Sequence, residues 1–403
     1  MADAMNGPLA GVRVLEMGAY TTGPLCARFL SNLGAEVIKV EPLRGELVRA
    51  LAYKVAGNSY IYYVHNYNKR GVALDTGTEA GRTVLYDLAA KVDVLIENFA
   101  FGTMEKWGFG ETALRAVNPG LIYCSCTGFG QTGPQRELRA LDTVIQGMGG
   151  VMSLTGQPGG PPTKCGLSAA DAMGATASVM AILGALLHKR RTGRGQRIDI
   201  SMHDVMGWMT APVWGALGAG GAAGPDGSRH IALAPQNLYR AADGLLVVEV
   251  ETGPELQALL RLAGAADLAA GLTPETAKSQ EAALDARIQA WAETQGVAAA
   301  VAACIAAGVP AAPVQGMAEI AEHPLTRERA MLVAMDHPGA GPIELLGSPF
   351  KLSRTPGIVA TPAPAVGQDT RAVLRDLLAY DSAQIDALAA SGAIGVAAST
   401  KAN

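Results

Sequence analysis

The sequence predicts an α/β protein whose larger domain is a doubly wound parallel sheet. Short apolar runs of strand length recur through the first half of the chain. They lie at residues 12–17, 37–40, 72–74, 92–99, 121–126 and 197–201. Helical patterns of about 10 to 15 residues separate several of these runs, and this alternation is typical of βαβ units. Ligands of such sheets bind at the carboxyl ends of the strands, so we expect the functional residues there.

The composition indicates a folded protein of enzyme size, without an overall positive charge that would attract nucleic acid or membranes. The chain has 403 residues, of which 49% are hydrophobic and 17% are charged, a balance unlike that of disordered proteins. Its net charge is −4, so any phosphate recognition must be local. The five cysteines form no CxxC pair or Cys/His cluster, and the N-terminal residues do not resemble a signal peptide. We therefore expect a reduced, cytoplasmic protein without a metal site.

Caps and turn residues set the expected boundaries of the first helices. A strand at residues 12–17 is followed by a helix in which Pro24 suits the first turn and Gly34 ends the pattern. A second helix, over residues 78–91, begins at Thr78 and Glu79.

The strongest helical pattern covers residues 168–191. Ser168 is a candidate N-cap, a long apolar body follows, and Gly193 is the expected C-terminal stop. The uncharged stretch 172–187 is short for a bilayer, so we interpret it as a buried segment of a folded domain.

The expected domain organisation follows from a change in composition near residue 215. Residues 215–229 are rich in glycine and poor in side chains that could pack, which indicates a linker. We expect a large domain at residues 1–205, a linker at 206–224 and a smaller α/β domain at 225–330. Residues 331–403 are expected to form a further linker and a C-terminal segment that returns to the large domain.

A glycine motif at residues 128–133, GFGQTG, matches the GxGxxG pattern of dinucleotide-binding loops. The residues after it do not form an apolar helix, and no acidic residue ends a second strand at the required distance. A structural glycine turn therefore accounts for the motif better than a nicotinamide or flavin site. The chain also has no P-loop motif.

Two aspartates leave a structural and a functional interpretation open. Asp171 follows Ser168 by three residues, so it could complete a capping box. The same place at a helix N-terminus suits a carboxylate nucleophile beside glycine-rich segments. Asp142 could likewise begin a helix or take part in a site. Lys69, Arg70 and Lys106 suit a solvated surface, with phosphate binding as the alternative.

Many segments resemble the class III coenzyme A transferases, the family of formyl-CoA transferase and carnitine CoA-transferase. The resemblance runs through GPLAGVRVLEMG with TTGP, LGAEVIKVE, NKRGVALD, DVLIENF, NPGLIYCSCTGFGQTGP, LTGQPGGPP and TGRGQRIDISM. It implies a large CoA-binding domain, a smaller α/β domain and an interlocked dimer of ring-like chains. It also implies a nucleophilic aspartate at Asp171 in GLSAADAMG. No permanently bound cofactor is implied, since coenzyme A and acyl-CoA are substrates.

The resemblance also carries over a set of CoA-contacting positions. These are Thr21, Thr22, Leu74, Asp75, Thr76, Asn98, Phe99, Ala100, Lys106, Arg139, Ala140, Leu141 and Asp142. The chain departs from formyl-CoA transferase-like sequences where Lys106 replaces an arginine, Pro42 replaces a basic residue and Leu141 replaces a tyrosine. A phosphate contact is therefore lost or relocated, and specificity for formyl and oxalyl groups is not expected.

The implied reaction moves CoA from a donor, for which succinyl-CoA is expected, to a carboxylic acid. Because Thr21, Thr22 and Leu141 leave room, we expect an acceptor bulkier than formate or oxalate, such as the substituted succinate benzylsuccinate. One alternative is an α-methylacyl-CoA racemase, which needs a histidine where this chain has Leu141. The other is one subunit of a heteromeric transferase, so the partner is either a second copy or a paralogue. Neither nucleic acid nor a membrane is expected as a partner.

Overall fold

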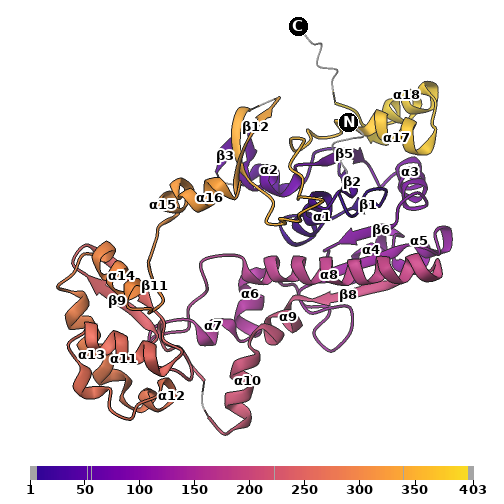
Figure 1. Cartoon of the computed structure of the whole chain (residues 1–403). Coiled ribbons are helices and arrows are strands. Elements are labelled where there is room, and N and C mark those ends of the chain that lie inside the picture. Colours follow the sequence, from indigo (N-terminus) through magenta and orange to yellow (C-terminus); the bar gives the residue numbers. More distant parts are fainter. Residues whose placement is uncertain (1–6, 52, 56, 222, 339, 398–403) are drawn as a thin grey trace. The chain divides into compact units, whose positions relative to one another are not determined.

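The computed structural model describes residues 7–51, 53–55, 57–221, 223–338 and 340–397. The chain divides into two compact units, which are described separately (Figure 1). Unit 1 comprises Met1–Val151, Cys165–Ala211 and Pro324–Asn403. Unit 2 comprises Met152–Lys164 and Pro212–His323.

The core of unit 1 is a seven-stranded sheet within the described residues, in the order β14-β5-β2-β1-β6-β7-β8. The strands are β1 (Arg13–Glu16), β2 (Glu36–Glu41), β5 (Lys69–Leu74), β6 (Val94–Glu97), β7 (Ile122–Thr127), β8 (Arg197–Ser201) and β14 (Ile394–Gly395). All neighbouring strands are parallel except β14, which pairs antiparallel with β5 at the sheet edge. The chain moves outward from β1 in one direction to β5 and in the other to β8. The predicted doubly wound sheet is thus confirmed, with its topological switch point between β1 and β6.

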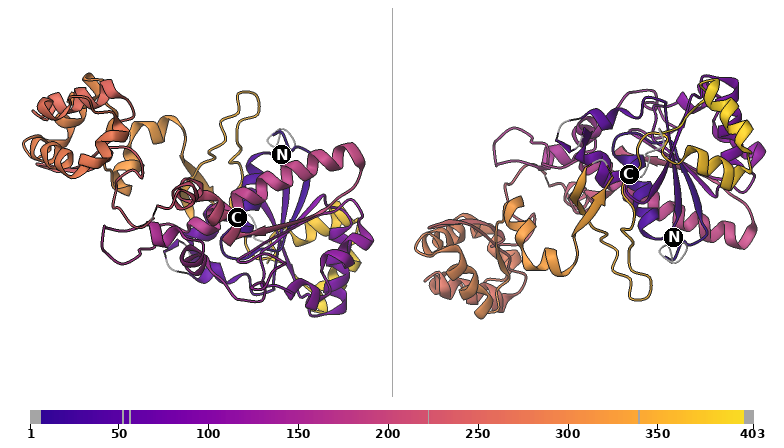
Figure 2. Two further views of the ribbon diagram at one scale, coloured as in Figure 1. Left: turned by 90° about the horizontal axis from the view of Figure 1, so that it is seen from below. Right: turned by 90° about the horizontal axis from the view of Figure 1, so that it is seen from above.

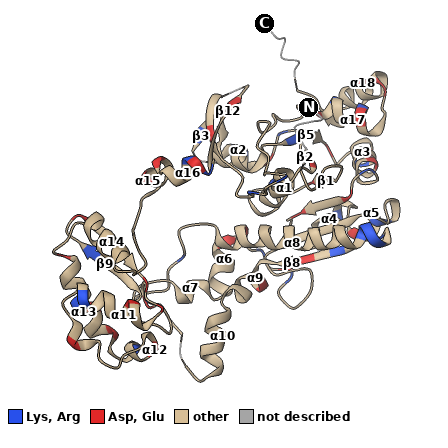
Figure 3. Cartoon of the chain, viewed as in Figure 1, with Lys and Arg blue, Asp and Glu red and all other residues tan. Residues whose placement is uncertain are grey.

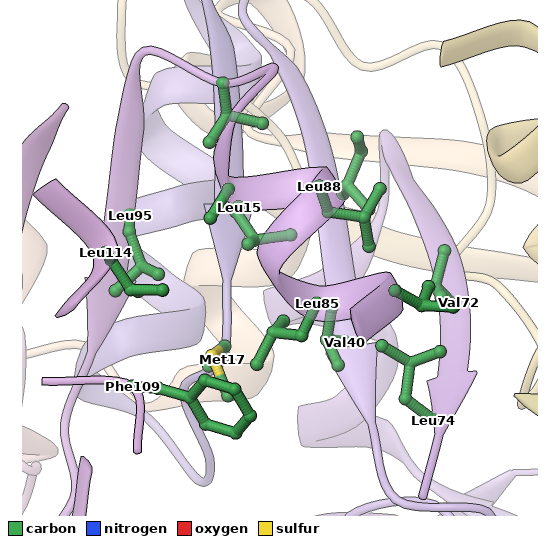
Figure 4. Packing of buried hydrophobic residues seen from close by; sticks show 14 of the residues in the cluster. Leu15, Met17, Val40, Val72, Leu74, Leu85, Leu88, Leu95, Phe109 and Leu114 are labelled. Atoms are coloured by element: carbon green, nitrogen blue, oxygen red, sulfur yellow. The ribbon is translucent and has the colours of Figure 1, made fainter. Parts of the chain in front are cut away.

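Helices cover both faces of this sheet because alternate strand residues are apolar on both sides. Val14 and Val37 face a cluster formed with α1 (Thr22–Asn32) and α8 (Ala169–Thr192). Leu15 and Ile38 face the other cluster, formed with α3 (Glu79–Ala89), α5 (Glu111–Val117), α17 (Thr370–Leu378) and α18 (Ser382–Ala390). Figure 2 shows α8 and the C-terminal helices on opposite sides of the strands. In Figure 4, Leu85 and Leu88 of α3 point at the strand residues.

Helix α8 is the longest element of unit 1 and matches the expected helix at residues 168–191. It is the one described helix that is long and apolar enough to cross a membrane. Between Asp171 and Lys189 it carries no Lys, Arg, Asp or Glu (Figure 3). Ala175, Val179, Ile182 and Ala185 are nevertheless buried in the cluster with α1 and the sheet. This packing accounts for one face of the apolar body of α8, while Met180 and Leu187 are exposed. The left-handed Gly193 ends the helix as predicted.

Other elements of unit 1 surround the sheet. They are the short helices η2 (Leu47–Ala50), α2 (Tyr60–Asn66), α4 (Thr103–Trp107), α6 (Asp142–Met148), α9 (Met202–Met209) and α16 (Pro324–Glu328), and the hairpins β3 (Lys54–Val55) with β4 (Asn58–Ser59) and β12 (Leu332–His337) with β13 (Gly341–Leu346). The second hairpin was not predicted. Its inward residues Met335, Ile343 and Leu345 pack on Tyr62 and Tyr63 of α2, so this hairpin forms through tertiary packing.

Unit 2 is a three-stranded antiparallel sheet covered by helices. The strands, in the order β11-β10-β9, are β9 (Asn237–Ala241), β10 (Gly244–Val248) and β11 (Ala311–Pro313). The helices are α11 (Gly253–Leu262), η3 (Ala266–Leu268), α12 (Pro274–Ala277), η4 (Lys278–Gln280), α13 (Glu281–Ala292), α14 (Val297–Ala306) and α15 (Met317–Glu322). Leu246, Leu259, Leu284 and Ile288 are buried at its centre.

The region expected to be a linker is partly helical. Two helices, α9 (Met202–Met209) and α10 (Ala211–Gly218), lie across residues 206–224, and α7 (Val151–Leu154) lies at the earlier crossing between the units. The two units meet in sequence at Ala211 and Pro212 and again at His323 and Pro324. Helix α10 was not predicted, because the region is rich in glycine. Its Ala, Leu and Trp residues supply the helix propensity.

Candidate active site

The loop between β1 and α1 lies at the switch point of the sheet. Asn98, the first residue after β6, holds this loop through two hydrogen bonds to Ala19. Its Oδ1 accepts the Ala19 N–H at 2.8 Å, and its Nδ2 donates to the Ala19 carbonyl at 2.9 Å. Parallel strands bring their carboxyl ends to one edge, so residues 79 positions apart meet here.

A buried cluster of ion-paired side chains also holds the β1–α1 loop. Both oxygens of Glu16 are paired, one with Lys39 at 3.1 Å and the other with Lys69 at 2.9 Å. Lys39 also donates to the Gly18 carbonyl, and Lys69 donates to the Pro24 carbonyl. The surface interpretation of Lys69 was wrong, because the side chain is fully buried with these partners. Removing one partner of such a cluster would leave a buried charge unpaired.

Asp171 lies in the first turn of α8 and faces the first turn of α1. The Thr22 hydroxyl donates to Oδ1 of Asp171 at 2.5 Å. Oδ2 accepts no hydrogen bond from any residue that the structure describes. Burial raises the pKa of Asp171, while the Thr22 hydrogen bond lowers it and the charge of Asp142 raises it further. One carboxylate oxygen is therefore held in place, and the other is free.

The N-terminus of α8 is capped by Asp142 and not by Ser168. Ser168 makes no side-chain capping bond. Instead, Oδ1 of Asp142 accepts the backbone N–H of Ala170 at 2.9 Å and that of Asp171 at 3.4 Å. The expectation that Ser168 caps this helix was wrong. Because Asp142 provides the cap, the Asp171 side chain is not needed to cap the helix. Asp142 is both the first residue of α6 and a neighbour of Asp171.

A second residue of α6 braces Asp142. The Gln146 amide donates to Oδ2 of Asp142 at 2.8 Å and to the Leu167 carbonyl at 3.0 Å. Its carbonyl oxygen accepts the Cys165 N–H at 3.0 Å. Gln146 therefore ties the segment before α8 to α6 and holds the capping carboxylate in place.

A cleft of about 280 Å³ opens beside the β1–α1 loop. It is lined by Met17, Gly18, Ala19, Val40, Glu41, Pro42, Arg44, Gly45, Glu46, Leu47, Leu74, Thr76, Phe99 and Trp107. Phe99 and Trp107 meet edge to face with their ring centres 5.0 Å apart. Arg44 is exposed, and it has no ion pair within the part of the chain that the structure describes. The cleft thus combines apolar walls with a free cation at the carboxyl edge of the sheet.

The predicted CoA-contacting residues gather around this edge, although only three of them line the cleft. Leu74, Thr76 and Phe99 do so. The others lie on the neighbouring segments: Thr21 and Thr22 at the start of α1, Asp75 after β5, Asn98 and Ala100 after β6, Lys106 on α4, and Arg139, Ala140, Leu141 and Asp142 at the start of α6. The Arg136 guanidinium stacks on the ring of Phe101, which shows that the segments around Ala100 and Arg139 are neighbours.

Sequence reasoning missed several residues at this edge. Arg44 and Glu46 follow β2, and Trp107 ends α4. The rule that ligands bind after parallel strands could have identified Arg44, since it comes three residues after the end of β2. Glu46 had no comparable signal, because its partners, the Tyr20 N–H and the Lys39 ammonium group, come close only in the folded structure.

The glycine motif GFGQTG forms a closed turn. Gly130 and Gly133 both have positive φ angles, which favour glycine. The Gln131 N–H between them donates to both oxygens of Asp199, each at 3.0 Å. The turn at residues 128–133 is therefore anchored to β8, in line with the structural interpretation.

The cleft is lined by the loop that leads into α1, and α1 begins at Thr22, which binds a carboxylate with one free oxygen. Such a site at the switch point of a doubly wound sheet is typical of an α/β enzyme. Residues 9–370 match the family model described as CoA-transferase family III. The chain therefore belongs to CoA-transferase family III and is an enzyme that uses acyl-CoA thioesters and carboxylic acids.

Individual relatives match over nearly the whole chain. The protein is 34% identical to succinyl-CoA–D-citramalate CoA-transferase of Chloroflexus aurantiacus over 92% of this chain and 94% of that one. It is 36% identical to succinyl-CoA:mesaconate CoA-transferase of Haloarcula hispanica, over 87% and 91% respectively. The crystal structure of a CAIB/BAIF family protein from Brucella suis has a TM-score of 0.82 and 33% identity, covering 92% of this chain and all of that chain.

Proposed function

We propose that this enzyme transfers CoA from succinyl-CoA to a substituted dicarboxylic acid through covalent intermediates on Asp171. One observation carries the proposal: Thr22 holds Oδ1 of Asp171, while Oδ2 accepts no hydrogen bond from the described residues. The carboxylate is half-buried, and its pKa is raised mainly by that burial. A poorly solvated carboxylate with one free oxygen is suited to attack a carbonyl carbon.

The first half of the reaction loads CoA onto the enzyme. Oδ2 of Asp171 attacks the thioester carbonyl carbon, the carbon–sulfur bond breaks, and CoA leaves as a thiolate. The product is a mixed anhydride between the acyl group and Asp171. The thiolate then attacks the aspartyl carbonyl carbon, which releases the donor acid as a carboxylate and leaves an aspartyl-CoA thioester. The two steps conserve the energy of the thioester, so no nucleotide is consumed.

The second half repeats the same chemistry in reverse with the acceptor. The acceptor carboxylate attacks the aspartyl thioester, CoA leaves again as a thiolate, and a second mixed anhydride forms. The thiolate then attacks the acceptor carbonyl, which releases the new acyl-CoA and restores the Asp171 carboxylate. Each tetrahedral intermediate carries an oxyanion, which we assign to backbone N–H donors of the glycine-rich segments.

The cleft beside the β1–α1 loop is proposed to hold the nucleotide end of CoA. Phe99 and Trp107 offer aromatic surface for the adenine ring, and Arg44 offers a cation for a phosphate. Arg44 would then supply the phosphate contact that Pro42 cannot make. Lys106, which is exposed one residue before Trp107, is a second candidate for this role.

The proposed substrates follow from the relatives and from the residues near Asp171. Two relatives carry succinyl-CoA in their names, with D-citramalate or mesaconate as the acceptor. Both acceptors are four-carbon diacids with a methyl branch. Leu141, which is 69% exposed, replaces the tyrosine of formyl-CoA transferase-like sequences and leaves space for a branch. We therefore keep a substituted succinate as the acceptor, with benzylsuccinate as the bulkiest candidate.

The assembly and location belong to the same proposal. We infer an interlocked dimer of this chain or a heteromer with a paralogous subunit, in the cytoplasm. None of the five cysteines forms a disulfide within the described residues, and four of them are buried, which suits a reducing compartment.

The experiment that tests the proposal traps the intermediate. The purified protein is incubated with succinyl-CoA and hydroxylamine, digested and analysed by mass spectrometry beside Asp171→Ala. A hydroxamate on the Asp171 peptide, absent from the variant, is the expected result. No adduct with any of several acyl-CoA donors would overturn the covalent mechanism. Acceptors are then compared by product mass, using benzylsuccinate, citramalate, mesaconate, glutarate and oxalate.

The same samples test the racemase alternative. A racemase removes and returns the α-proton of a branched acyl-CoA, which requires a base beside that carbon. Leu141 cannot serve as that base. We expect no deuterium to enter 2-methylacyl-CoA in heavy water, and rapid exchange without CoA transfer would favour the racemase instead.

A further inference from the structure

Tyr20 has a backbone conformation that must be held by its surroundings. It lies in the β1–α1 loop two residues before Thr22, and its φ angle is +62°. Residues other than glycine rarely adopt this left-handed conformation, and they do so mainly where neighbouring groups enforce it. Tyr20 is 41% exposed, so packing of the side chain does not account for the conformation.

Two side chains from different elements hold the backbone of Tyr20. Oε2 of Glu46, just before η2, accepts the Tyr20 N–H at 3.2 Å. The imidazole of His65, on α2, lies near the Tyr20 backbone, which contributes to the pKa of His65. Glu46 is itself held by an ion pair with Lys39 at 3.0 Å. With Asn98 on Ala19, the two residues before Thr21 are thus hydrogen-bonded by side chains of two separate segments, and His65 of a third segment lies beside them.

His65 is suited to this role because it stays neutral. Burial, together with the positive charges of Arg28, Lys69 and Lys39, lowers the pKa of His65 to about 3. A neutral imidazole carries one N–H. Among the residues that the structure describes, Nδ1 of His65 has no hydrogen-bond partner, so we assign the proton to the other ring nitrogen, which can donate to the Tyr20 carbonyl.

We propose that Glu46 and His65 are positioning residues, which hold Tyr20 in its left-handed conformation and so aim the Thr22 hydroxyl at Asp171. The inference rests on the proposed role of Asp171 as nucleophile. Helix α1 begins at Thr22, so the direction of the chain at Tyr20 determines where that first turn lies. If Tyr20 relaxed to an ordinary conformation, the Thr22 hydroxyl would move away from Oδ1.

The test compares acylation of Asp171 in His65→Phe, His65→Gln and wild type. Phenylalanine removes the N–H donor, whereas glutamine restores one. We expect the rate of Asp171 acylation by succinyl-CoA to fall about 10- to 100-fold in His65→Phe and to recover largely in His65→Gln. The KM for succinyl-CoA should change little. Tyr67→Phe is the matched control, since it removes a buried hydroxyl bonded to Asn32 without touching the loop.

The pH profile separates positioning from general loosening of the fold. Because the Thr22 hydrogen bond lowers the pKa of Asp171, its loss should move the acidic limb of acylation to higher pH. We expect this shift in His65→Phe, Glu46→Ala and Thr22→Val, but not in Tyr67→Phe. The other titratable groups facing Asp171 are Asp142 and the Cys126 thiol, whose pKa burial raises to about 12. Neither changes in these variants.

A second background keeps the proposal testable if His65→Phe folds poorly. Glycine adopts a left-handed conformation without enforcement, so His65→Phe should have a smaller effect on acylation when Tyr20 is glycine. Equal effects in both backgrounds, or an unchanged acidic limb, would overturn the positioning role. Failure of the proposed function gives a different result, since wild type itself would then form no Asp171 adduct.

Discussion

The carboxylate of Asp142 lies at the N-terminus of α8, where its Oδ1 accepts the backbone N–H of Asp171 at 3.4 Å. The same oxygen accepts the N–H of Ala170, so a residue of α6 caps the helix that carries the proposed nucleophile. The two carboxylates also repel each other, which contributes to the raised pKa of Asp171. Asp142 therefore both caps α8 and raises the pKa of Asp171 through its charge.

Replacing Asp142 should separate these two effects. Asp142→Asn keeps an N-cap oxygen but removes the charge, so we expect the pKa of Asp171 to fall and the acidic limb of acylation to move to lower pH. Asp142→Ala also removes the cap, so it should in addition lower the unfolding free energy by about 1 kcal/mol. Urea unfolding and the pH dependence of acylation measure the two effects. An acidic limb that stays in place in Asp142→Asn would contradict the coupling.

Asp171→Asn should be inactive yet more stable than wild type at neutral pH. The folded-state pKa of Asp171 is raised, so ionising it disfavours the folded state once the pH exceeds its unfolded value. Asparagine removes that cost, and we expect a gain of about 0.5 to 2 kcal/mol at pH 7. The gain should disappear as the pH falls below the ordinary aspartate range. Ser168→Ala is the control, because Ser168 makes no capping bond and should change neither activity nor stability.

Arg44 should contribute to CoA affinity through a phosphate group. We expect Arg44→Gln to weaken CoA binding about tenfold and Arg44→Lys to weaken it less. The loss should be smaller with a CoA analogue that lacks the phosphate concerned, so calorimetry with CoA and 3′-dephospho-CoA identifies which phosphate it is. Arg82→Gln on α3 is the matched control, because Arg82 is also exposed and unpaired among the described residues. Equal affinities of wild type and Arg44→Gln would refute this assignment.

Glu97 should make the stability of the enzyme fall as the pH rises toward neutrality. Burial raises the pKa of Glu97 to about 7, partly offset by hydrogen bonds from Ser125 and from the Phe99 N–H. A raised carboxyl pKa stabilises the fold fully below the unfolded value near 4, and that contribution is lost as the pH passes through 7. Glu97→Gln should therefore be more stable than wild type by roughly 1 to 3 kcal/mol at pH 8, with little difference at pH 4. A difference in unfolding free energy between Glu97→Gln and wild type that stays the same at all pH values would contradict this expectation.

The site was predictable in part because parallel strands place their carboxyl ends together. Periodicity located six of the seven strands of the sheet, and the order of the βαβ units gave the edge where Leu74, Asn98 and Thr22 gather. The short strand β14 was not predicted, because two residues carry no detectable period. Lys69 was predicted to lie on the surface because the sequence does not show that Glu16, 53 positions earlier, is buried beside it.

The sequence by itself determined the six parallel strands of the sheet, the main helices that cover it and the two apolar faces of the sheet, because propensity and periodicity act over a few neighbouring residues. It also carried the family motifs around Asp171. The tertiary structure alone decided which side chains meet: Thr22 reaches Asp171 across 149 positions, and Asp142 caps α8 from 28 positions away. Such pairs depend on strand order and on the crossing of helices over the sheet. Long-range packing therefore decided how the Asp171 carboxylate is held, whereas local sequence determined only that an aspartate begins that helix.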